Sequence, residues 1–210
     1  MNTTTPVQGL SKGEGEEVGA RFEFGTFNIT TTYWWLSLDS ELHFVGDSNS
    51  VEPGPATDRR GYEVVAFWRP LSWVALDAVW TGSRARYVDG PDGSYVPGAV
   101  ENAGEFGVSL VRDLWEASVR VRYLGKYPLI EDNSQRADAE TGVNLRAAWK
   151  PGRVTVYAEV LNILDADGKD IVYFYGANVA GLDPPGEQVE GRVSRAEEPR
   201  TLRVGVKYAF

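Results

Sequence analysis

The sequence contains no cysteine and only one histidine, His43, among its 210 residues. The lack of cysteine excludes disulfides, cysteine-based zinc sites and thiol nucleophiles, and a single histidine cannot supply a multi-histidine metal site. His43 lies close in sequence to Ser37 and Ser40, but a histidine near the outer end of a strand is more often solvated or packed than catalytic. We therefore expect no catalytic residue and no enzyme activity.

Positive charge is scarce as well, with 21 lysines and arginines against 30 aspartates and glutamates and a formal net charge of −9. A chain with this balance is not expected to have nucleic acid as a partner. Acidic residues gather at Asp165, Asp167 and Asp170, but their spacing does not match a twelve-residue calcium loop. We expect no metal site and no cofactor.

Long apolar runs are also missing. No stretch reaches eighteen consecutive apolar residues, so the sequence predicts no membrane-spanning helix. The N-terminal stretch MNTTTPVQGLSKGEGEE is polar and glycine-rich, without the apolar segment of a secretory signal peptide. Aromatic residues, by contrast, make up 12% of the chain and include seven tryptophans, which require either a large core or a membrane interface.

Apolar and polar residues alternate along most of the chain, beginning with its last ten residues, TLRVGVKYAF. Successive strand side chains point to opposite faces, so this pattern predicts strands with one apolar and one polar face. No segment keeps the 3.6-residue period of a helix. We expect about nine strands, with one long strand over 27–45 whose register changes near Trp34 and Trp35. The other expected strands cover 16–24, 61–69, 74–81, 105–111, 115–127, 141–150, 154–160 and 201–210.

Short and long connections alternate between these strands. The short ones lie at 25–26, 70–72, 112–114 and 151–153, and the long polar ones at about 46–59, 82–101, 125–137 and 165–199. This alternation is typical of an up-and-down antiparallel barrel with tight turns at one end and long loops at the other. Aromatic residues flank the tight turns, as at a lipid–water interface. The expected periplasmic aromatic girdle consists of Phe24, Phe27, Trp68, Trp73, Trp115 and Trp149.

Two interpretations of the alternating strands remain open. In a soluble β-sandwich or lipocalin-like barrel the apolar face would form the core, whereas in an outer-membrane barrel it would contact lipid. The polar face carries charges of both signs between small Gly, Ala, Ser and Thr residues, as at Glu116, Arg120 and Arg122. A crowded barrel interior suits such charges because they can pair, and the unequal loop lengths also favour the membrane barrel.

The segments at 37–47, 59–70 and 154–176 resemble strands of TonB-dependent outer-membrane receptors, the last through Asn162, Ile163, Leu164 and Asp165. The C-terminal strand resembles the closing strand of these receptors, with the assembly signal Arg203, Gly205, Tyr208 and Phe210. The resemblance covers essentially the whole chain. It implies residence in a Gram-negative-type outer membrane and recognition of the terminal strand by the barrel assembly machinery.

The resemblance further implies a barrel of twenty-two strands around an N-terminal plug domain. Such a receptor imports a scarce, bulky nutrient, such as an iron–siderophore complex or cobalamin, with energy relayed by TonB through the plug. Residues 1–210 would then be the C-terminal part of the barrel, with short periplasmic turns and long extracellular loops, and without plug domain or signal peptide. We expect such a fragment not to transport by itself, since its partners are outer-membrane lipid, the remaining strands, the plug and TonB.

Two other functions stay open. One is a small complete outer-membrane barrel with a structural or adhesive role, which would need eight or ten strands. The other is a soluble β-barrel that binds an apolar ligand.

If this chain contacts a small-molecule ligand such as a siderophore, the contacts are expected in the long loops, because function concentrates on loops held by a rigid scaffold. The aromatic segment at 171–181 is the first candidate, with Tyr173, Phe174 and Tyr175 able to stack on an aromatic or metal-chelate ligand. The acidic loops disfavour a strongly anionic ligand.

Overall fold

The computed structural model of the chain describes residues 11–45, 50–90, 94–178, 180–181 and 183–210. Within these residues the secondary structure is all β, and no helix is long and apolar enough to cross a membrane. The strands are β1 (Gly13–Phe24), β2 (Phe27–Leu38), β3 (Leu42–Val45), β4 (Ser50–Pro53), β5 (Thr57–Leu71), β6 (Val74–Tyr87), β7 (Asn102–Arg112), β8 (Trp115–Leu124), β9 (Tyr127–Pro128), β10 (Arg136–Ala137), β11 (Glu140–Trp149), β12 (Val154–Leu161), β13 (Lys169–Ala177), β14 (Val189–Ala196) and β15 (Thr201–Tyr208).

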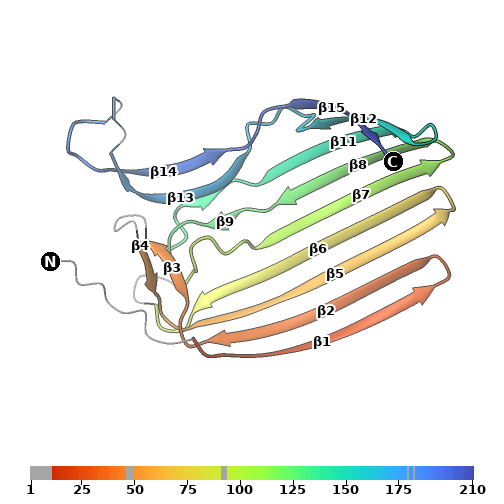
Figure 1. Ribbon diagram of the computed structural model, residues 1–210. Helices are drawn as coiled ribbons and strands as arrows, with labels where there is room; N and C mark the ends of the chain where they lie inside the picture. The colour runs from red at the N-terminus through yellow and green to blue at the C-terminus, as the bar shows by residue number, and fades with distance from the viewer. Residues whose placement is uncertain (1–10, 46–49, 91–93, 179, 182) are drawn as a thin grey trace.

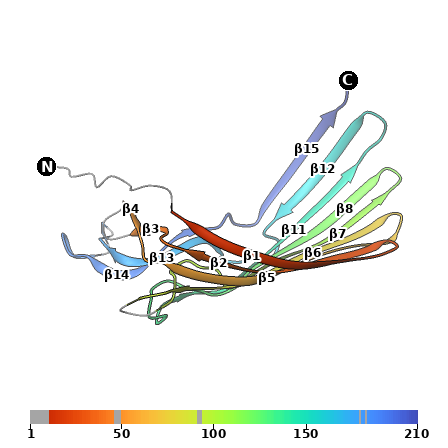
Figure 2. The ribbon, with the colours of Figure 1, turned by 90° about the horizontal axis from the view of Figure 1, so that it is seen from below.

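Nine long strands form one antiparallel sheet in the order β1-β2-β5-β6-β7-β8-β11-β12-β15, and each strand pairs with the next of these along the chain. Short turns join them at one end, here called the turn end, and long connections join them at the other, the loop end (Figure 1). The sheet is curved and does not close, because β1 and β15 lie at its two edges (Figure 2). An up-and-down, partial barrel is therefore confirmed.

One row of directly opposed residues crosses the whole sheet on a single face, and all its members are apolar. The row is Phe24, Phe27, Trp68, Leu76, Val108, Val119, Leu145, Val160 and Leu202. It starts at the turn end of β1 and finishes at the loop end of β15, as expected for strands that are tilted in a barrel. We call this the outer face.

The outer face is not covered by a second sheet among the described residues. Val204, Val206 and Trp149 expose 69%, 67% and 42% of their surface. Contiguous exposed apolar surface on this scale marks contact with a membrane or a partner. Among the described residues these side chains do not form the core that the soluble interpretation requires.

The opposite, inner face is covered by the connections at the loop end. Thr57, Ala85 and Tyr87 point inward there and are buried, and Val96 from the connection between β6 and β7 packs against Ala85 and Tyr87. A second buried cluster is made by Tyr127, Leu129, Ala137 and Val172. The long connections thus have a core of their own, which fixes the loop end in space.

The strand expected over 27–45 is instead two elements. β2 ends at Leu38, and β3 belongs to a separate hairpin with β4. The expected register change near Trp34 and Trp35 is also wrong, because β2 pairs with β5 without interruption. The two tryptophans simply point to opposite faces, and Trp34 fits because it lies over Gly61, where a side chain would collide with its ring.

The long connections are also more ordered than the sequence predicted. They contain the hairpins β3–β4, β9–β10 and β13–β14, and β5 and β6 extend well beyond the expected 61–69 and 74–81. Strands of two to four residues, such as β9 and β10, are too short to show an alternating pattern.

Candidate functional site

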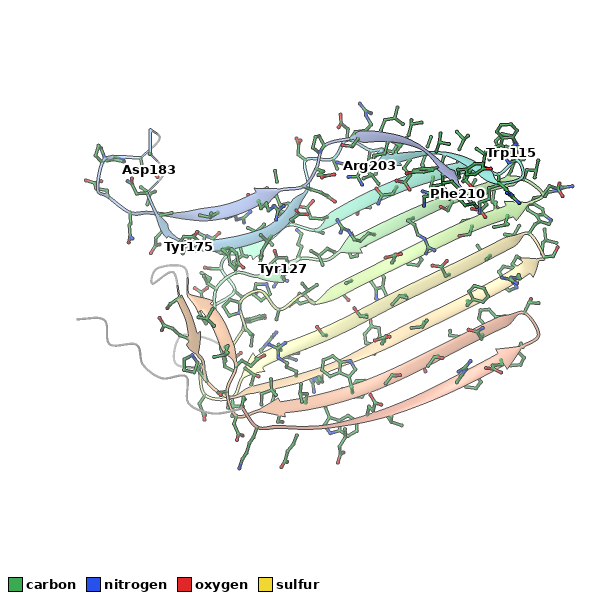
Figure 3. The ribbon with its side chains drawn as sticks, in the orientation of Figure 1. Trp115, Tyr127, Tyr175, Asp183, Arg203 and Phe210 are labelled. Carbon is green, nitrogen blue, oxygen red and sulfur yellow. The ribbon has the colours of Figure 1, made fainter. Side chains whose placement is uncertain are left out.

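A cleft of about 660 Å³ lies at the loop end, between the β3–β4 hairpin, the connection after β6, the segment after β9 and strand β13. All three residues predicted to contact a ligand, Tyr173, Phe174 and Tyr175, line this cleft. They belong to β13, paired with β14, and not to an irregular loop. Figure 3 shows Tyr175 at the loop end, far from Trp115 and Phe210 at the turn end.

The three aromatic residues are not equivalent. Val172, which is 6% exposed, belongs to the buried cluster with Tyr127 and Leu129, and Phe174 packs against the same cluster. Tyr173 and Tyr175 have the opposite parity on β13, and Tyr173 is 36% exposed. Because Phe174 anchors the strand, the two tyrosines are the residues best placed to stack on a ligand.

The cleft is acidic. Its lining includes three carboxylates, from Glu41, Glu52 and Glu131, and one guanidinium, from Arg59. Arg59 forms an ion pair with Glu41 at 2.7 Å, and the hydroxyl of Thr57 donates to the same carboxylate at 2.9 Å. The pair joins β5 to the segment before β3 and so shapes one wall of the cleft.

Two tyrosines of the loop end hold their protons strongly. Tyr87, at the loop end of β6, lines the cleft, and burial followed by the charges of Glu131 and Glu41 raises its pKa to about 12. Burial likewise raises the pKa of Tyr127 in β9. Both hydroxyls therefore remain neutral well above physiological pH.

The inner face below the cleft carries paired charges. Arg120 on β8 reaches Asp77 on β6 and, at 3.5 Å, Glu105 on β7. Arg146 pairs with Glu159, Lys150 pairs with Glu116, and Arg122 pairs with Glu197 at 2.6 Å. Cross-strand ion pairs of this kind satisfy charges on a face that is polar but crowded. No group of three or more His, Cys, Asp or Glu side chains that could hold a metal ion occurs in the described part of the chain.

The residues predicted to form a periplasmic aromatic girdle all lie in or beside the strand segments next to the short turns. Figure 3 shows one of them, Trp115, at the turn end. Phe24, Phe27 and Trp68 oppose one another on three successive strands. The rings of Trp115 and Trp149 stack with their centroids 6.1 Å apart. Contact with a membrane interface stays a prediction for these residues.

Sequence reasoning missed a second aromatic level, near the loop end of the outer face. It consists of Tyr33, Trp35, Tyr62, Trp80 and Tyr123. Tyr62 lies six residues from Trp68 on β5, and Tyr123 lies eight residues from Trp115 on β8, or about 20 to 27 Å along the strands. The signal was available, because these aromatics share the parity of the turn-end girdle, but their alignment depends on the register between strands.

The predicted assembly signal lies on the edge strand β15 and just beyond it. Tyr208 and Phe210 contact each other edge to face, with ring centroids 5.3 Å apart, and Phe210 is fully exposed. Gly205 leaves room for the ring of Tyr157, which a side chain at position 205 would overlap. Arg203 pairs with Glu198 at 3.1 Å. A role in assembly stays a prediction.

The segment from Asn162 to Asp165 forms a tight bend after β12. Asn162 and Asp165 both adopt positive φ values, 48° and 53°. The buried side chain of Asn162 donates to the carbonyls of Ala166 and Glu198 and accepts from the Ala166 amide. The bend thereby ties the end of β12 to the chain that leads into β15.

Comparisons with known proteins agree with this architecture. The family model described as "TonB dependent receptor-like, beta-barrel" matches residues 8–163. The search of curated proteins finds no match.

Several solved structures share the fold. The ferric yersiniabactin uptake receptor FyuA from Yersinia pestis aligns with a TM-score of 0.76 and 17% identity, over 95% of this chain and 30% of the receptor. The copper transporter OprC gives a TM-score of 0.70 with 16% identity, over 95% and 32%. The ferric citrate transporter FecA gives 0.68 with 19% identity, over 93% and 31%. The chain thus spans about 30% of the length of these proteins.

Proposed function

Because the chain belongs to the family of TonB-dependent receptor-like β-barrels, we propose that it forms part of an outer-membrane receptor that imports a scarce, bulky nutrient. The proposed cargo is an iron–siderophore complex, cobalamin or a similar metal chelate. The similar structures include uptake proteins for ferric yersiniabactin, for copper and for ferric citrate, so the shared fold is compatible with several metal-containing cargoes.

The observation that carries this proposal is the outer face. One apolar row runs through all nine strands, and aromatic residues bound it at the turn end and near the loop end. An apolar band between two aromatic levels is what a bilayer requires of a transmembrane β-barrel. The inner face, with its paired charges, would then face the lumen and the plug domain.

The two edges of the sheet support an assembly with further strands. Within the described sheet, β1 pairs only with β2, and β15 pairs only with β12. An unpaired strand edge in hydrocarbon leaves backbone groups without partners, which costs several kcal/mol per group. We propose that β1 and β15 pair with additional strands that complete the barrel around a plug, and that the plug transmits the action of TonB.

The residues that line the loop-end cleft indicate which kind of ligand it would bind. Tyr173 and Tyr175 offer aromatic faces, and the three glutamates outnumber Arg59. A site with this balance favours a ligand that is neutral or positively charged overall, for example a metal chelate whose charge is neutralised by its cation. Phosphate-rich ligands are disfavoured.

Uptake measurements test the proposal. A strain lacking the gene for the full-length protein would be compared with the complemented strain, using radiolabelled ferric siderophores of different charge and labelled cobalamin. We expect one of these cargoes to enter only when the gene and TonB are both present. Uptake that persists without TonB, or recovery of the protein in the soluble fraction without detergent, would contradict the proposal.

A further inference from the structure

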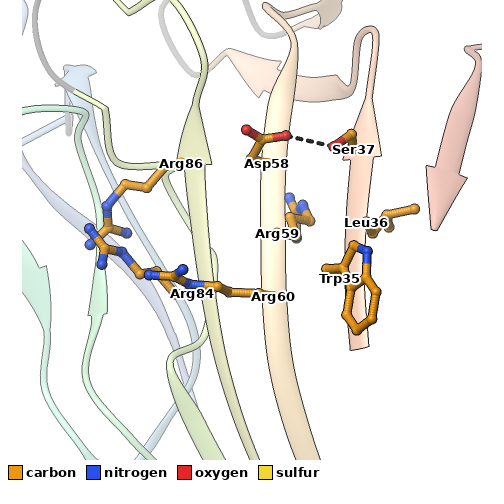
Figure 4. Close-up of a pocket in the computed structure, with 8 residues that line it drawn as sticks. All are labelled: Trp35, Leu36, Ser37, Asp58, Arg59, Arg60, Arg84 and Arg86. Carbon is orange, nitrogen blue, oxygen red and sulfur yellow. Dashed lines mark hydrogen bonds between the residues drawn. The ribbon is translucent and has the colours of Figure 1, made fainter. Parts of the chain in front are cut away.

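Three arginines gather on the outer face at the loop end of β5 and β6. Arg60 and Arg84 stand directly opposite each other across the two strands, and Arg86 opposes Asp58 in the next pair on the same face. They border a cavity of about 440 Å³ that also includes Trp35 (Figure 4). A neighbouring cavity of about 580 Å³ is lined by the same three arginines.

The charges in this cluster are not balanced within the described residues. Asp58 is the single carboxylate among the residues lining the first cavity, and it accepts a hydrogen bond from Ser37 at 2.7 Å. No described acidic side chain forms an ion pair with Arg60 or Arg84. Like charges directly opposite each other on adjacent strands are destabilising. Both arginines are exposed, and an anion from outside the chain that lies between them would remove this repulsion.

Glu101 lines the neighbouring cavity, but its carboxylate is paired with Arg136. On the outer face, further carboxylates belong to Glu14 and Glu16 on β1. Glu16 opposes Trp35 on β2, and Trp35 in turn opposes Arg60 on β5. Two strand spacings therefore separate Glu16 from Arg60, or about 10 Å. At that distance the carboxylate leaves the space between the guanidinium groups open to another anion.

Arg86 is held in place by its surroundings. Its guanidinium lies over the ring of Tyr95 at 3.6 Å and donates to the carbonyl of Ala85 at 2.6 Å. A guanidinium fixed on an aromatic ring keeps other N–H donors for an acceptor, and little side-chain entropy is lost when that acceptor binds. Arg86 thus provides a preorganised third donor beside the opposed pair.

The cluster lies at the height of the outer lipid–water interface. Arg60 is two residues beyond Tyr62 and eight residues from Trp68 on the same strand. Eight residues correspond to about 27 Å along a strand, or about 20 Å across the membrane for a strand tilted by about 40°. Long arginine side chains extend such a position further toward the headgroups.

We infer that Arg60, Arg84 and Arg86 bind a phosphate group of an anionic lipid headgroup in the outer leaflet. Guanidinium groups bind phosphate oxygens through paired, charge-assisted hydrogen bonds, and one phosphate between Arg60 and Arg84 would replace their repulsion by attraction. Trp35 and Tyr62 beside the cluster offer apolar surface to the acyl chains of the same lipid. The inference depends on the proposed membrane location but not on the nutrient.

Lipid binding by the full-length protein in detergent tests this inference. The probe is lipid A with two phosphates, compared with lipid A from which both phosphates have been removed, and bound lipid is counted by native mass spectrometry. We expect the wild-type protein to bind the phosphorylated form, and R60Q/R84Q to bind it at least tenfold more weakly. The control R69Q/R112Q removes the same charge from arginines at the turn end and should stay within twofold of wild type.

Further measurements test whether these arginines form the site and whether the phosphate that they bind belongs to a lipid. Addition of 10 mM inorganic phosphate should displace little of the lipid, whereas complete displacement would contradict a lipid site. In lipid-free detergent R60Q/R84Q should melt no lower than wild type, because the repulsion is gone, and only the wild type should gain stability on addition of phosphorylated lipid A. Equal lipid binding by wild type and R60Q/R84Q would overturn the inference. None of these readings depends on nutrient uptake, so failure of the uptake proposal would be recognised separately.

Discussion

A charge placed on the outer face should destabilise the barrel, whereas the same charge one residue further along should not. Val108 on β7 is 37% exposed and opposes Leu76 and Val119. It lies four residues before Arg112 at the turn end, or about 10 Å from that end along the axis of a barrel with tilted strands. Ser109 is its neighbour on the inner face and opposes Ala75 and Ser118.

The magnitude follows from the cost of a cation in hydrocarbon. An arginine on the lipid face near the middle of an outer-membrane barrel costs about 2–4 kcal/mol. We therefore expect Val108→Arg to be about 3 kcal/mol less stable than Val108→Ala, a change of more than a hundredfold in the folding equilibrium. Ser109→Arg should change stability by less than about 1 kcal/mol, because its side chain enters the polar interior.

The assay is unfolding of the full-length protein by guanidinium in phosphatidylcholine vesicles, with the heat-modified gel mobility of the folded barrel as a second reading. Val108→Ala is the reference variant because it, like Val108→Arg, loses the packing of the valine side chain. A difference below about 0.5 kcal/mol between Val108→Arg and Val108→Ala is the value typical of a water-exposed surface and would refute the lipid-facing assignment.

Three further changes have expected outcomes. Replacing Tyr173 and Tyr175 together by Ala should weaken nutrient binding about tenfold or more, since each lost stacking contact is worth about 0.5–1.5 kcal/mol. Titration calorimetry measures the affinity, with Tyr123→Ala as the control variant. Unchanged affinity would end the ligand-contact proposal. Asn162→Ala should cost about 2–3 kcal/mol in denaturant unfolding, because it removes three hydrogen bonds of a buried side chain, and a loss under about 0.5 kcal/mol would show that the bend does not depend on them. Gly61→Ala should lower the free energy of unfolding by about 1–3 kcal/mol, since its methyl group would lie 2.5 Å from the carbonyl oxygen of Gly82. Gly191→Ala should leave stability unchanged, because no atom lies within 4 Å of the position of its methyl group. Equal stability of the two variants would contradict the close packing at Gly61.

The main sheet could be predicted from the sequence because its signal is local. Several of its nine strands alternate strongly, as in the run from Trp115 to Tyr123, and the tight turns help to separate the strands whose alternation is weaker. The adjacent tryptophans at positions 34 and 35 were misread, because the space that accommodates Trp34 is provided by Gly61 on another strand. Local patterns do not contain that partner.

The site was predictable only in part for the same reason. The aromatic run Tyr173, Phe174 and Tyr175 was visible in the sequence, but the separate roles of Phe174 and the tyrosines depend on the buried cluster around Val172. The opposition of Arg60 and Arg84 requires the register between β5 and β6. Register is set by interactions across strands, so such pairs emerge only when the sheet is assembled.

Site-directed spin labelling along β8 measures directly which face of the sheet contacts hydrocarbon. The chain has no cysteine of its own, so single cysteines can be introduced from Trp115 to Leu124 and labelled with a nitroxide in the full-length, membrane-embedded protein. We expect the labels at 115, 117, 119, 121 and 123 to be relaxed by dissolved oxygen, and those at the intervening positions to be relaxed by a water-soluble nickel chelate. Strong relaxation of both sets by the nickel chelate, or shielding of the first set from oxygen, would contradict contact between the outer face and lipid.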